Sequence, residues 1–357
     1  MTLQDTLQVH GAQLAPDGIP LQFSHLGAEY DAALNSAVLM VRSHEGRLEL
    51  TGRDRLALMH RMSTNHLEAL AAGQGAATIF ANANARILDR AVVVSRPERA
   101  LVLAEPGRGP ALENYLRRNI FFNDDVQLVN VTGSTAQFAL HGPQADAVVA
   151  RLLPDAPGLA LFASAEAEVG GVVTLFVRNK PLAGAHWTVI APTEAASIVW
   201  EALITAGAPL GLRPAGSLTY NTLRIRAGRP GVGRELSDAY LPLEVGLWDE
   251  ISFHKGCYTG QEIIARMESR NRLARVMVRL TPAAPLEAPA DLFDNGRLVG
   301  RVTSSVTSPR GEHFAIGVVK VDSAVPGRAL AAGPAAIATL VEGFAAVPPP
   351  MVESDSA

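Results

Sequence analysis

The stretch Lys255–Glu262 reads Lys-Gly-Cys-Tyr-Thr-Gly-Gln-Glu and contains Cys257, the only cysteine among the 357 residues. The β-prone run 251–253 precedes it, and the run 263–267 that follows has the composition of a helix. The pattern predicts a short strand, then a turn that carries Cys257, then a helix. A single cysteine excludes an internal disulfide, and it excludes a cysteine cluster that could hold an iron–sulfur centre without help.

The local sequence predicts an activated thiol at this turn. Thr259 and Glu262 have the spacing of a capping box, so the helix should begin just past Cys257. Free amide groups and the helix dipole at that start, with the Lys255 ammonium nearby, favour the thiolate form of Cys257. Gly256 and Gly260 would let a ligand or another chain approach the backbone closely. The alternative is a small, buried and inert cysteine, and charge and spacing alone do not decide between the two.

The stretch KGCYTGQE resembles the signature of the YgfZ-type folate-binding proteins, a family that is related to the glycine-cleavage T-protein and includes a mitochondrial iron–sulfur assembly factor. The resemblance implies tetrahydrofolate, or a one-carbon derivative of it, as the cofactor. It implies iron–sulfur client or assembly proteins as partners, and Cys257 and Lys255 as the catalytic residues. The residues that it implies for folate binding are Asp89, Arg90, Arg226, Tyr258, Gly260, Gln261 and Glu262.

Composition and charge indicate a soluble globular protein, with 48% hydrophobic and 18% charged residues. No apolar run approaches the roughly 20 residues that a membrane-spanning helix needs. The first residues show neither the basic nor the apolar part of a secretory signal, so we expect a cytoplasmic protein. The net charge of −4 and the pI of 6.2 argue against direct nucleic-acid binding.

The order of the predicted strands and helices resembles that of the T-protein fold. This resemblance implies an α+β protein with a T-protein-like multidomain fold, in which a ferredoxin-like part precedes a small C-terminal β-barrel. Pro16, Gly18 and Pro20 interrupt any periodicity near the start, and the proline-rich run 282–285 is expected to link the barrel to the body. The predicted domains are a flexible lead-in, 1–24; a folate-binding body, 25–280, in two parts, 25–150 and 151–280; the barrel, 281–347; and a tail, 348–357.

Two positions differ from the T-protein pattern in charge. T-proteins carry two adjacent aspartates where this chain has Asp89 and Arg90, and a glutamate where it has Arg226. Aminomethyl transfer requires acid–base handling at the folate nitrogens, which suits carboxylates rather than guanidinium groups. The two arginines could still bind the glutamyl carboxylates of a folate.

Five arginines and two aromatic residues have two interpretations each. The arginines form either an ordinary solvated surface or a docking patch for polyglutamyl folate, an acidic partner or RNA, of which RNA fits the overall acidity least. Tyr220 and Trp248 could stack on a pterin, although such residues more often belong to the core. The arginines are Arg266, Arg270, Arg272, Arg275 and Arg279.

Three functions are compatible with these sequence features. The first is a folate-binding accessory protein that supports the assembly or repair of iron–sulfur clusters in client enzymes, tRNA-modifying enzymes among them, with Cys257 as the reactive centre. The second is a tetrahydrofolate-dependent aminomethyltransferase of the glycine-cleavage system. The third is a catalytically silent folate-binding module. The signature favours the first, and the altered charges at Arg90 and Arg226 disfavour the second.

Overall fold

The computed structural model describes residues 2–23, 25–269 and 273–345. These residues form two compact units. The first unit is the described part of Met1–Met62, His66–Thr78 and Arg90–Leu223. The second unit is the described part of Ser63–Asn65, Ile79–Asp89 and Arg224–Ala357.

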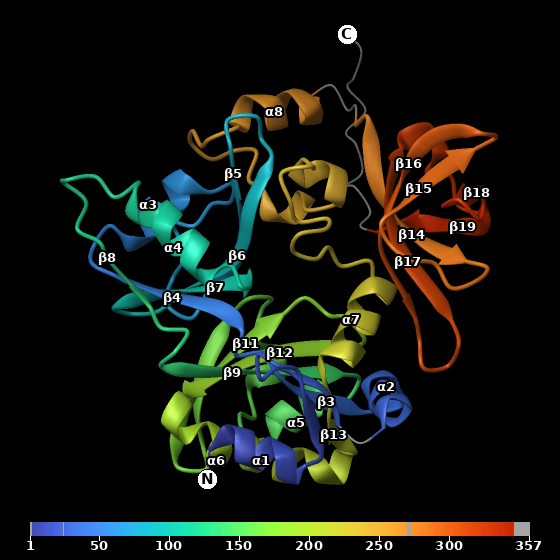
Figure 1. Cartoon of the computed structure of the whole chain (residues 1–357). Coiled ribbons are helices and arrows are strands. Elements are labelled where there is room, and N and C mark those ends of the chain that lie inside the picture. The colour runs from blue at the N-terminus through green and yellow to red at the C-terminus, as the bar shows by residue number, and fades with distance from the viewer. Residues whose placement is uncertain (1, 24, 270–272, 346–357) are drawn as a thin grey trace. The chain divides into compact units, whose positions relative to one another are not determined.

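Eight α-helices and nineteen strands are present in the described part of the chain (Figure 1). The helices are α1 Leu3–Val9, α2 Leu26–Asn35, α3 Arg55–Met62, α4 Gly109–Arg117, α5 Ala145–Ala150, α6 Ala196–Gly207, α7 Ser217–Arg226 and α8 Gln261–Ser269. The strands are β1 Ala12–Leu14, β2 Pro20–Phe23, β3 Ala37–Val41, β4 Glu45–Thr51, β5 Gly75–Ala81, β6 Ile87–Ser95, β7 Arg99–Pro106, β8 Gln127–Asn130, β9 Thr135–Gly142, β10 Ser164–Val169, β11 Val172–Asn179, β12 Ala185–Pro192, β13 Leu212–Pro214, β14 Arg275–Pro282, β15 Ala290–Asp294, β16 Arg297–Thr307, β17 His313–Lys320, β18 Ala329–Ala332 and β19 Ile337–Phe344.

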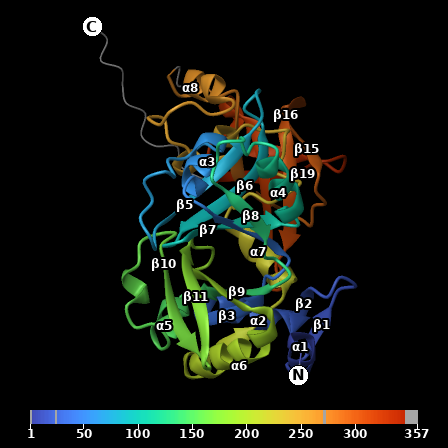
Figure 2. The same cartoon turned by 90° about the vertical axis from the view of Figure 1, so that its left-hand side faces the viewer.

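A six-stranded sheet in the order β10-β11-β12-β9-β3-β13 forms the centre of the first unit. Helices α1, α5 and α6 cover one of its faces, where Trp187 and Trp200 are both fully buried (Figure 1 and Figure 2). Leu39 of β3 belongs to that core, whereas its neighbours Val38 and Met40 pack with α2 and α7. Because successive residues of a strand point to opposite faces, α2 and α7 lie on the other side of β3.

A second sheet, in the order β5-β6-β7-β4-β8, packs against the first through an apolar layer. Val92 and Val94 of β6 meet Leu175 and Val177 of β11 there. Strand β6 contributes to two cores. Val92 and Val94 belong to this apolar layer, whereas the first residues of the strand, 87–89, group with the second unit. The α+β architecture predicted from the sequence is therefore confirmed.

The expectation that residues 1–24 form a flexible lead-in is wrong for the described residues. Helix α1 begins at a capping box in which Thr2 and Asp5 exchange hydrogen bonds of 2.9 and 3.2 Å, and Leu7 is buried in the core of the first unit. Strands β1 and β2 then pair as a hairpin. Its prolines and glycine are turn formers, which interrupt a helical pattern without preventing order.

The second unit contains a closed barrel in the order β14-β17-β16-β15-β18-β19 and back to β14, which confirms the predicted C-terminal β-barrel. Strand β14 begins at Arg275 and runs to Pro282, so the boundary expected at 281 falls inside a strand. Pro282 pairs with Thr339 instead of forming a link. The predicted tail, 348–357, lies outside the described residues. No helix in the described part of the chain is long and apolar enough to cross a membrane, and the cytoplasmic location stays a prediction.

A second core in this unit joins the outside of the barrel to the chain that precedes it. Met277, Ile316 and Val318 of the barrel pack there with Ile79 and Ile87. The same cluster contains Tyr258 and Ile264, which flank the start of α8.

A buried ion pair adds to this junction. The fully buried carboxylate of Glu235 lies 3.4 Å from the Arg224 guanidinium and accepts hydrogen bonds from the hydroxyls of Thr303 and Ser304 on β16. Arg224 also donates to the Ser304 hydroxyl at 3.1 Å. Because both charges are out of water, each depends on the other for compensation.

Removing one partner of this pair should therefore be costly. We expect Glu235→Ala to lower the free energy of unfolding by about 3 to 5 kcal/mol, since Arg224 would stay buried with its charge uncompensated. Urea denaturation followed by tryptophan fluorescence measures the change.

The matched control is Asp291→Ala, which removes a carboxylate of the same barrel that pairs with Arg301 at 4.0 Å while both side chains are more than half exposed. We expect a loss below about 1 kcal/mol for this exposed pair. Equal losses in the two variants would contradict the importance of the buried pair.

Candidate functional site

The stretch Lys255–Glu262 forms an irregular turn that leads into α8, as predicted. The strand predicted at 251–253 is absent from these described residues, which run instead as irregular backbone. Helix α8 begins at Gln261, so Gly260 and not Thr259 immediately precedes it. The capping box assigned to Thr259 and Glu262 is therefore wrong by one residue, and both side chains are exposed.

Thr64 connects strand β5 to the chain that leads into this turn. Its backbone N–H donates to the Ile79 carbonyl at 3.0 Å, and the Ile79 N–H donates to its hydroxyl at 3.1 Å. The hydroxyl donates to the Glu250 carbonyl at 2.8 Å, and the Thr64 carbonyl accepts from the Ser252 N–H at 2.9 Å. Thr64 is fully buried, so these bonds satisfy groups that water cannot reach.

Lys255 is a structural anchor as well as a member of the signature. Its ammonium donates to the Ser63 carbonyl at 2.6 Å and lies 5.1 Å from the centre of the Tyr258 ring. Only 9% of the residue is exposed. The burial of an ammonium requires such acceptors, and they draw Lys255 inward, toward the segment Ser63–Asn65.

Gly260 is the glycine that the turn requires. Its φ is +85°, which favours glycine, and a Cβ there would lie 2.8 Å from both the Ala85 Cα and the Asn82 carbonyl oxygen. Asn82 in turn accepts bonds from Asn84 and Arg86 through its side chain, which fixes the turn between β5 and β6. Gly256 is different, since a Cβ there would have no atom within 4 Å. A close approach by another part of the same chain therefore occurs at Gly260 and not at Gly256, and the approach of a ligand or another chain stays a prediction.

Cys257 is exposed while the residues near it on either side, Lys255 and Tyr258, are buried. The alternative of a buried, inert cysteine is thus wrong. The turn presents a thiol to solvent from a backbone that is fixed by neighbouring contacts. Such a thiol can reach a partner molecule or exchange with a disulfide. Its activation by the helix start stays a prediction.

Tyr258 and Gln261 have structural contacts. Tyr258 packs in the apolar cluster with Ile79 and Ile87, and burial raises the pKa of its phenol to about 12. The Gln261 amide donates to the Lys255 carbonyl at 3.5 Å, which closes the turn on itself. Their roles in folate binding stay predictions.

Asp89 and Arg90 point to opposite faces of β6, as expected for successive strand residues. Asp89 is 6% exposed and shares a face with Ile87, which belongs to the same apolar cluster as Tyr258. The strand thus brings a buried carboxylate to the core that supports the Cys257 turn. Arg90 forms an ion pair of 2.9 Å with Glu105 in the first unit, so its charge is balanced there.

Arg226 lies at the exposed end of α7, with its guanidinium 5.9 Å from the centre of the Phe314 ring. The neighbouring Arg224 belongs instead to the buried pair with Glu235. The sequence analysis did not distinguish the buried Arg224 from the exposed Arg226. Their different surroundings follow from helical geometry, because residues two apart lie on different sides of a helix.

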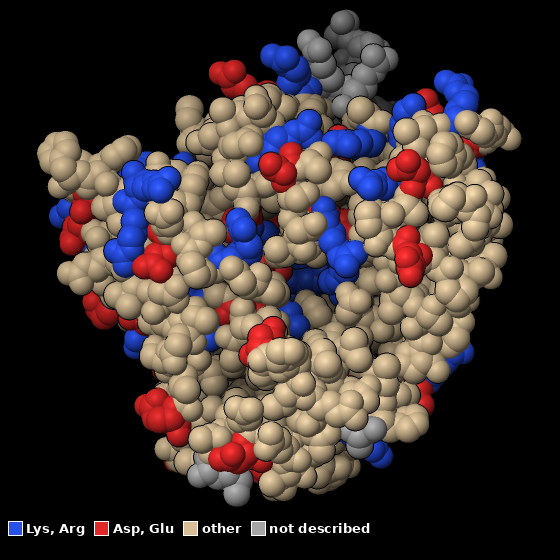
Figure 3. Space-filling model, in the orientation of Figure 1, with Lys and Arg blue, Asp and Glu red and all other residues tan. Residues whose placement is uncertain are grey.

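Of the five arginines that could form either a solvated surface or a docking patch, two are paired with carboxylates. Arg275 donates to Glu244 at 2.8 Å, and Arg279 lies 3.6 Å from Glu342, so both are paired. Arg266 is exposed on α8, whereas Arg270 and Arg272 lie outside the described residues. On the face shown in Figure 3, Lys and Arg side chains are interspersed with Asp and Glu side chains. Among the described residues, no group of three His, Cys, Asp or Glu side chains could hold a metal ion.

The segment Ser63–Asn65 was missed by sequence reasoning. Its local pattern indicates only the end of a helix, and the signal that it contacts a stretch about 190 residues later is not local. The polar run Ser-Thr-Asn after an apolar helix is the one hint, because such residues often bond to backbone groups.

Comparison with known proteins supports the predicted fold. A model of the GCVT N-terminal domain matches residues 3–255. The chain is 32% identical over 356 residues to an Arabidopsis thaliana protein whose assignment as a chloroplastic transferase is provisional, covering 99% of this chain and 82% of that one. It is 29% identical over 315 residues to an aminomethyltransferase of Geobacillus kaustophilus, covering 87% and 86%.

A solved structure has the same fold. Glycine cleavage system aminomethyltransferase T from Bartonella henselae superposes with a TM-score of 0.83 over 97% of this chain and 98% of that one, at 23% identity. The T-protein-like fold predicted from the sequence is therefore confirmed.

The two glycines of the turn should respond differently to substitution. We expect Gly260→Ala to lower the free energy of unfolding by about 2 to 4 kcal/mol, from overpacking against Ala85 and from the left-handed backbone. Gly256→Ala should change it by less than about 0.5 kcal/mol, because the added methyl group meets no atom. Urea denaturation of both variants measures the difference, and a well tolerated Gly260→Ala would refute the close approach.

The buried phenol of Tyr258 should make stability depend on pH in the alkaline range. A tyrosine in the unfolded chain has a pKa of about 10, whereas burial raises that of Tyr258 to about 12. The folded protein keeps a proton that the unfolded chain loses, so stability falls as the pH rises from about 10 to about 12. The Tyr258→Phe variant lacks this titrating group, so its free energy of unfolding should fall less steeply between pH 10 and pH 12. Urea denaturation at a series of pH values measures the difference. Parallel pH profiles would show that Tyr258 ionises equally in both states.

Proposed function

This chain belongs to the family defined by the GCVT N-terminal domain, and from this premise we propose that it is a YgfZ-type accessory protein that binds a reduced folate and supports iron–sulfur enzymes through Cys257. The observation that carries the proposal is the placement of Cys257. Its thiol is exposed on a turn that Lys255 and Gly260 hold in position by buried or close contacts. A packing role does not require an exposed thiol on such a turn.

The residues present fit a reduced folate. Asp89 is a buried carboxylate beside an apolar cluster, which is the combination that suits the donor groups and the flat ring of a pterin. Arg226 is an exposed cation that could pair with a glutamyl carboxylate. In this proposal, Asp89 orients the ring and Arg226 binds the anionic tail. The bound folate would supply a carrier for a one-carbon unit.

The proposed role of Cys257 follows from the fact that it is the only cysteine in the sequence. An iron–sulfur cluster needs several ligands, and this chain has one cysteine, so it would assist a cluster that a client enzyme holds. An exposed thiol group can provide one ligand for a limited time or exchange with a client disulfide. The proposed clients are iron–sulfur enzymes, tRNA-modifying enzymes among them.

A tetrahydrofolate-dependent aminomethyltransferase is the second candidate function. It is favoured by 29% identity to the Geobacillus kaustophilus aminomethyltransferase over 87% of this chain. Against it stand Arg90 and Arg226, which occupy positions where the T-protein pattern has carboxylates. Arg90 is moreover neutralised by Glu105, so neither position supplies an acid or a base for the transfer.

Two substitutions should separate folate binding from the role of the thiol. We expect Asp89→Asn to weaken the binding of tetrahydrofolate by about tenfold or more, since it removes a charge-assisted hydrogen bond. Cys257→Ser should leave this affinity within about twofold, because an exposed oxygen replaces an exposed sulfur.

The same Cys257→Ser variant should fail to restore iron–sulfur enzyme activity in a strain that lacks the protein. Tryptophan fluorescence measures the affinity, and aconitase activity in extracts measures the restoration.

Gly256→Ala is the matched control, since it alters the same turn without a steric conflict. The accessory function is wrong if Cys257→Ser restores activity as well as Gly256→Ala does. Turnover of an aminomethyl-lipoyl carrier on the order of 1 per second or faster would establish the second candidate instead. If tetrahydrofolate produces no saturable change in the tryptophan fluorescence of the wild-type protein, folate binding is excluded from both candidate functions.

A further inference from the structure

The loop between α4 and β8 exposes two consecutive aromatic residues. Phe122 is fully exposed, at 104% of its reference area, and Phe121 is 56% exposed. The loop extends away from the helix and the sheet that it connects (Figure 1). Exposed aromatic rings are costly in water, and aromatic side chains are the commonest anchors of protein interfaces.

The loop is fixed from one side by Arg61 of α3. This guanidinium donates to the Asn119 carbonyl at 2.9 Å, forms an ion pair with Asp124 and lies 4.4 Å from the centre of the Phe121 ring. The Asp124 carboxylate also accepts from the Phe121 N–H at 2.7 Å. These contacts close the loop across its base and orient the first ring.

A second set of contacts fixes the other end of the loop. The Asp125 N–H donates to the Asp54 carboxylate at 3.0 Å, and the Asp54 N–H donates to the Asp125 carbonyl at 3.2 Å. Gly52, with a φ of +96°, allows the close approach, because a Cβ there would lie 2.1 Å from the Asp125 carbonyl oxygen. Phe122 is therefore exposed from an ordered loop, and its binding to a partner would cost little conformational entropy.

The charges beside the rings indicate what a partner must offer. Arg61 pairs with Asp124, Arg53 with Asp54, and Arg117 with Glu113. Arg118 is exposed and has no ion-pair partner among the described residues. It lies three residues before Phe121, so a partner that receives the rings could also reach this guanidinium.

We propose that the loop of Phe121 and Phe122 is a docking surface for a protein partner that has an apolar pocket with a carboxylate at its rim. Phe122 fills the pocket, Phe121 packs at its edge on the Arg61 guanidinium, and Arg118 pairs with the carboxylate. The combination of a central aromatic ring and an arginine is typical of the residues that dominate binding energy at interfaces. This inference does not depend on the proposed function.

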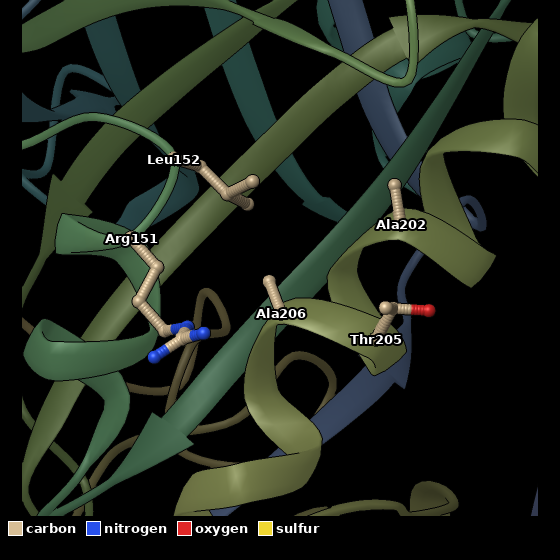
Figure 4. A pocket seen from close by; sticks show the side chains of 5 residues that line it. All are labelled: Arg151, Leu152, Ala202, Thr205 and Ala206. Carbon is tan, nitrogen blue, oxygen red and sulfur yellow. The ribbon is translucent and has the colours of Figure 1, made fainter.

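Two other occupants fit less well. An anionic membrane surface would find little attraction here, because Arg53 and Arg61 are already paired with Asp54 and Asp124, and the chain has a net charge of −4. A second copy would have to supply the pocket. The hollow of about 570 Å³ beside α6 in the first unit is lined by Arg151, Leu152 and Ala202, and so offers a cation in place of the carboxylate (Figure 4).

Photo-crosslinking in living cells tests the proposal with the full chain. p-Benzoylphenylalanine is placed at Phe122 and, as the matched control, at Val173, which is 64% exposed on β11 of the same unit. We expect one discrete protein adduct from position 122, none from position 173, and loss of that adduct when Arg118→Glu is added. With the purified partner, Phe122→Ser should raise the Kd by about tenfold or more, and the change should be absent for Val173→Thr. The crosslinked peptide of the partner should contain an aspartate or a glutamate.

Several results would overturn the proposal. The docking surface is excluded by any one of three results: no adduct at position 122, an adduct that survives Arg118→Glu, or a Kd that Phe122→Ser leaves unchanged.

Other results would assign the loop to another occupant. Dissociation of a dimer by Phe122→Ser in sedimentation velocity would assign the loop to a second copy. Binding of the wild type to phosphatidylglycerol vesicles that Phe122→Ser abolishes would assign it to a membrane. Phe122→Ser should melt at the wild-type temperature, because its ring packs against nothing, and a lower melting temperature would show that the ring is structural.

Discussion

The hydrogen bonds of one buried threonine organise the region that carries the chemistry. Thr64 uses its N–H, its carbonyl and its hydroxyl at once, and so ties Ile79 of β5 to Glu250 and Ser252 before the Cys257 turn. Thr64, Ile79 and Glu250 are buried, so their backbone groups would cost free energy if they lost their partners. The ammonium of Lys255 adds a second connection, to the adjacent Ser63 carbonyl. Three parts of the chain that are distant in sequence therefore hold one turn in one position.

Two further constraints act on the same region. Gly260 allows the turn to lie directly on the backbone of Asn82 and Ala85, and the pair of Arg224 and Glu235 fastens the preceding chain to β16 of the barrel. The consequence for function is that Cys257 is displayed by a scaffold and not by a loose loop. Asp89 belongs to the same core through its neighbour Ile87, so the proposed cofactor carboxylate and the thiol share one support.

The sequence was informative wherever a pattern was local or specific. The helix after the signature, the C-terminal barrel and the T-protein-like order of elements were predicted correctly. Errors arose where one residue of register mattered, as at Thr259, or where turn formers were taken as signs of disorder, as at Pro16 and Gly18. Pro282 was predicted to be part of a link, but it is the last residue of a paired barrel strand. Turn-forming residues do not reveal whether the chain on each side finds a strand to pair with.

By itself, the sequence determined that this chain carries one thiol, in a motif of high specificity, and that arginines replace two family carboxylates. The single thiol is a property of composition, and the two replacements follow from the resemblance to the T-protein pattern, so neither needs coordinates. Only the tertiary structure decided that Cys257 is exposed while Lys255 and Tyr258 are buried, and that Arg90 is neutralised by Glu105. Only the tertiary structure revealed that Thr64 connects β5 to the chain before the Cys257 turn, and that the loop of Phe122 is an ordered, exposed surface. Burial and pairing depend on which distant residues meet, and a local pattern contains no record of those contacts.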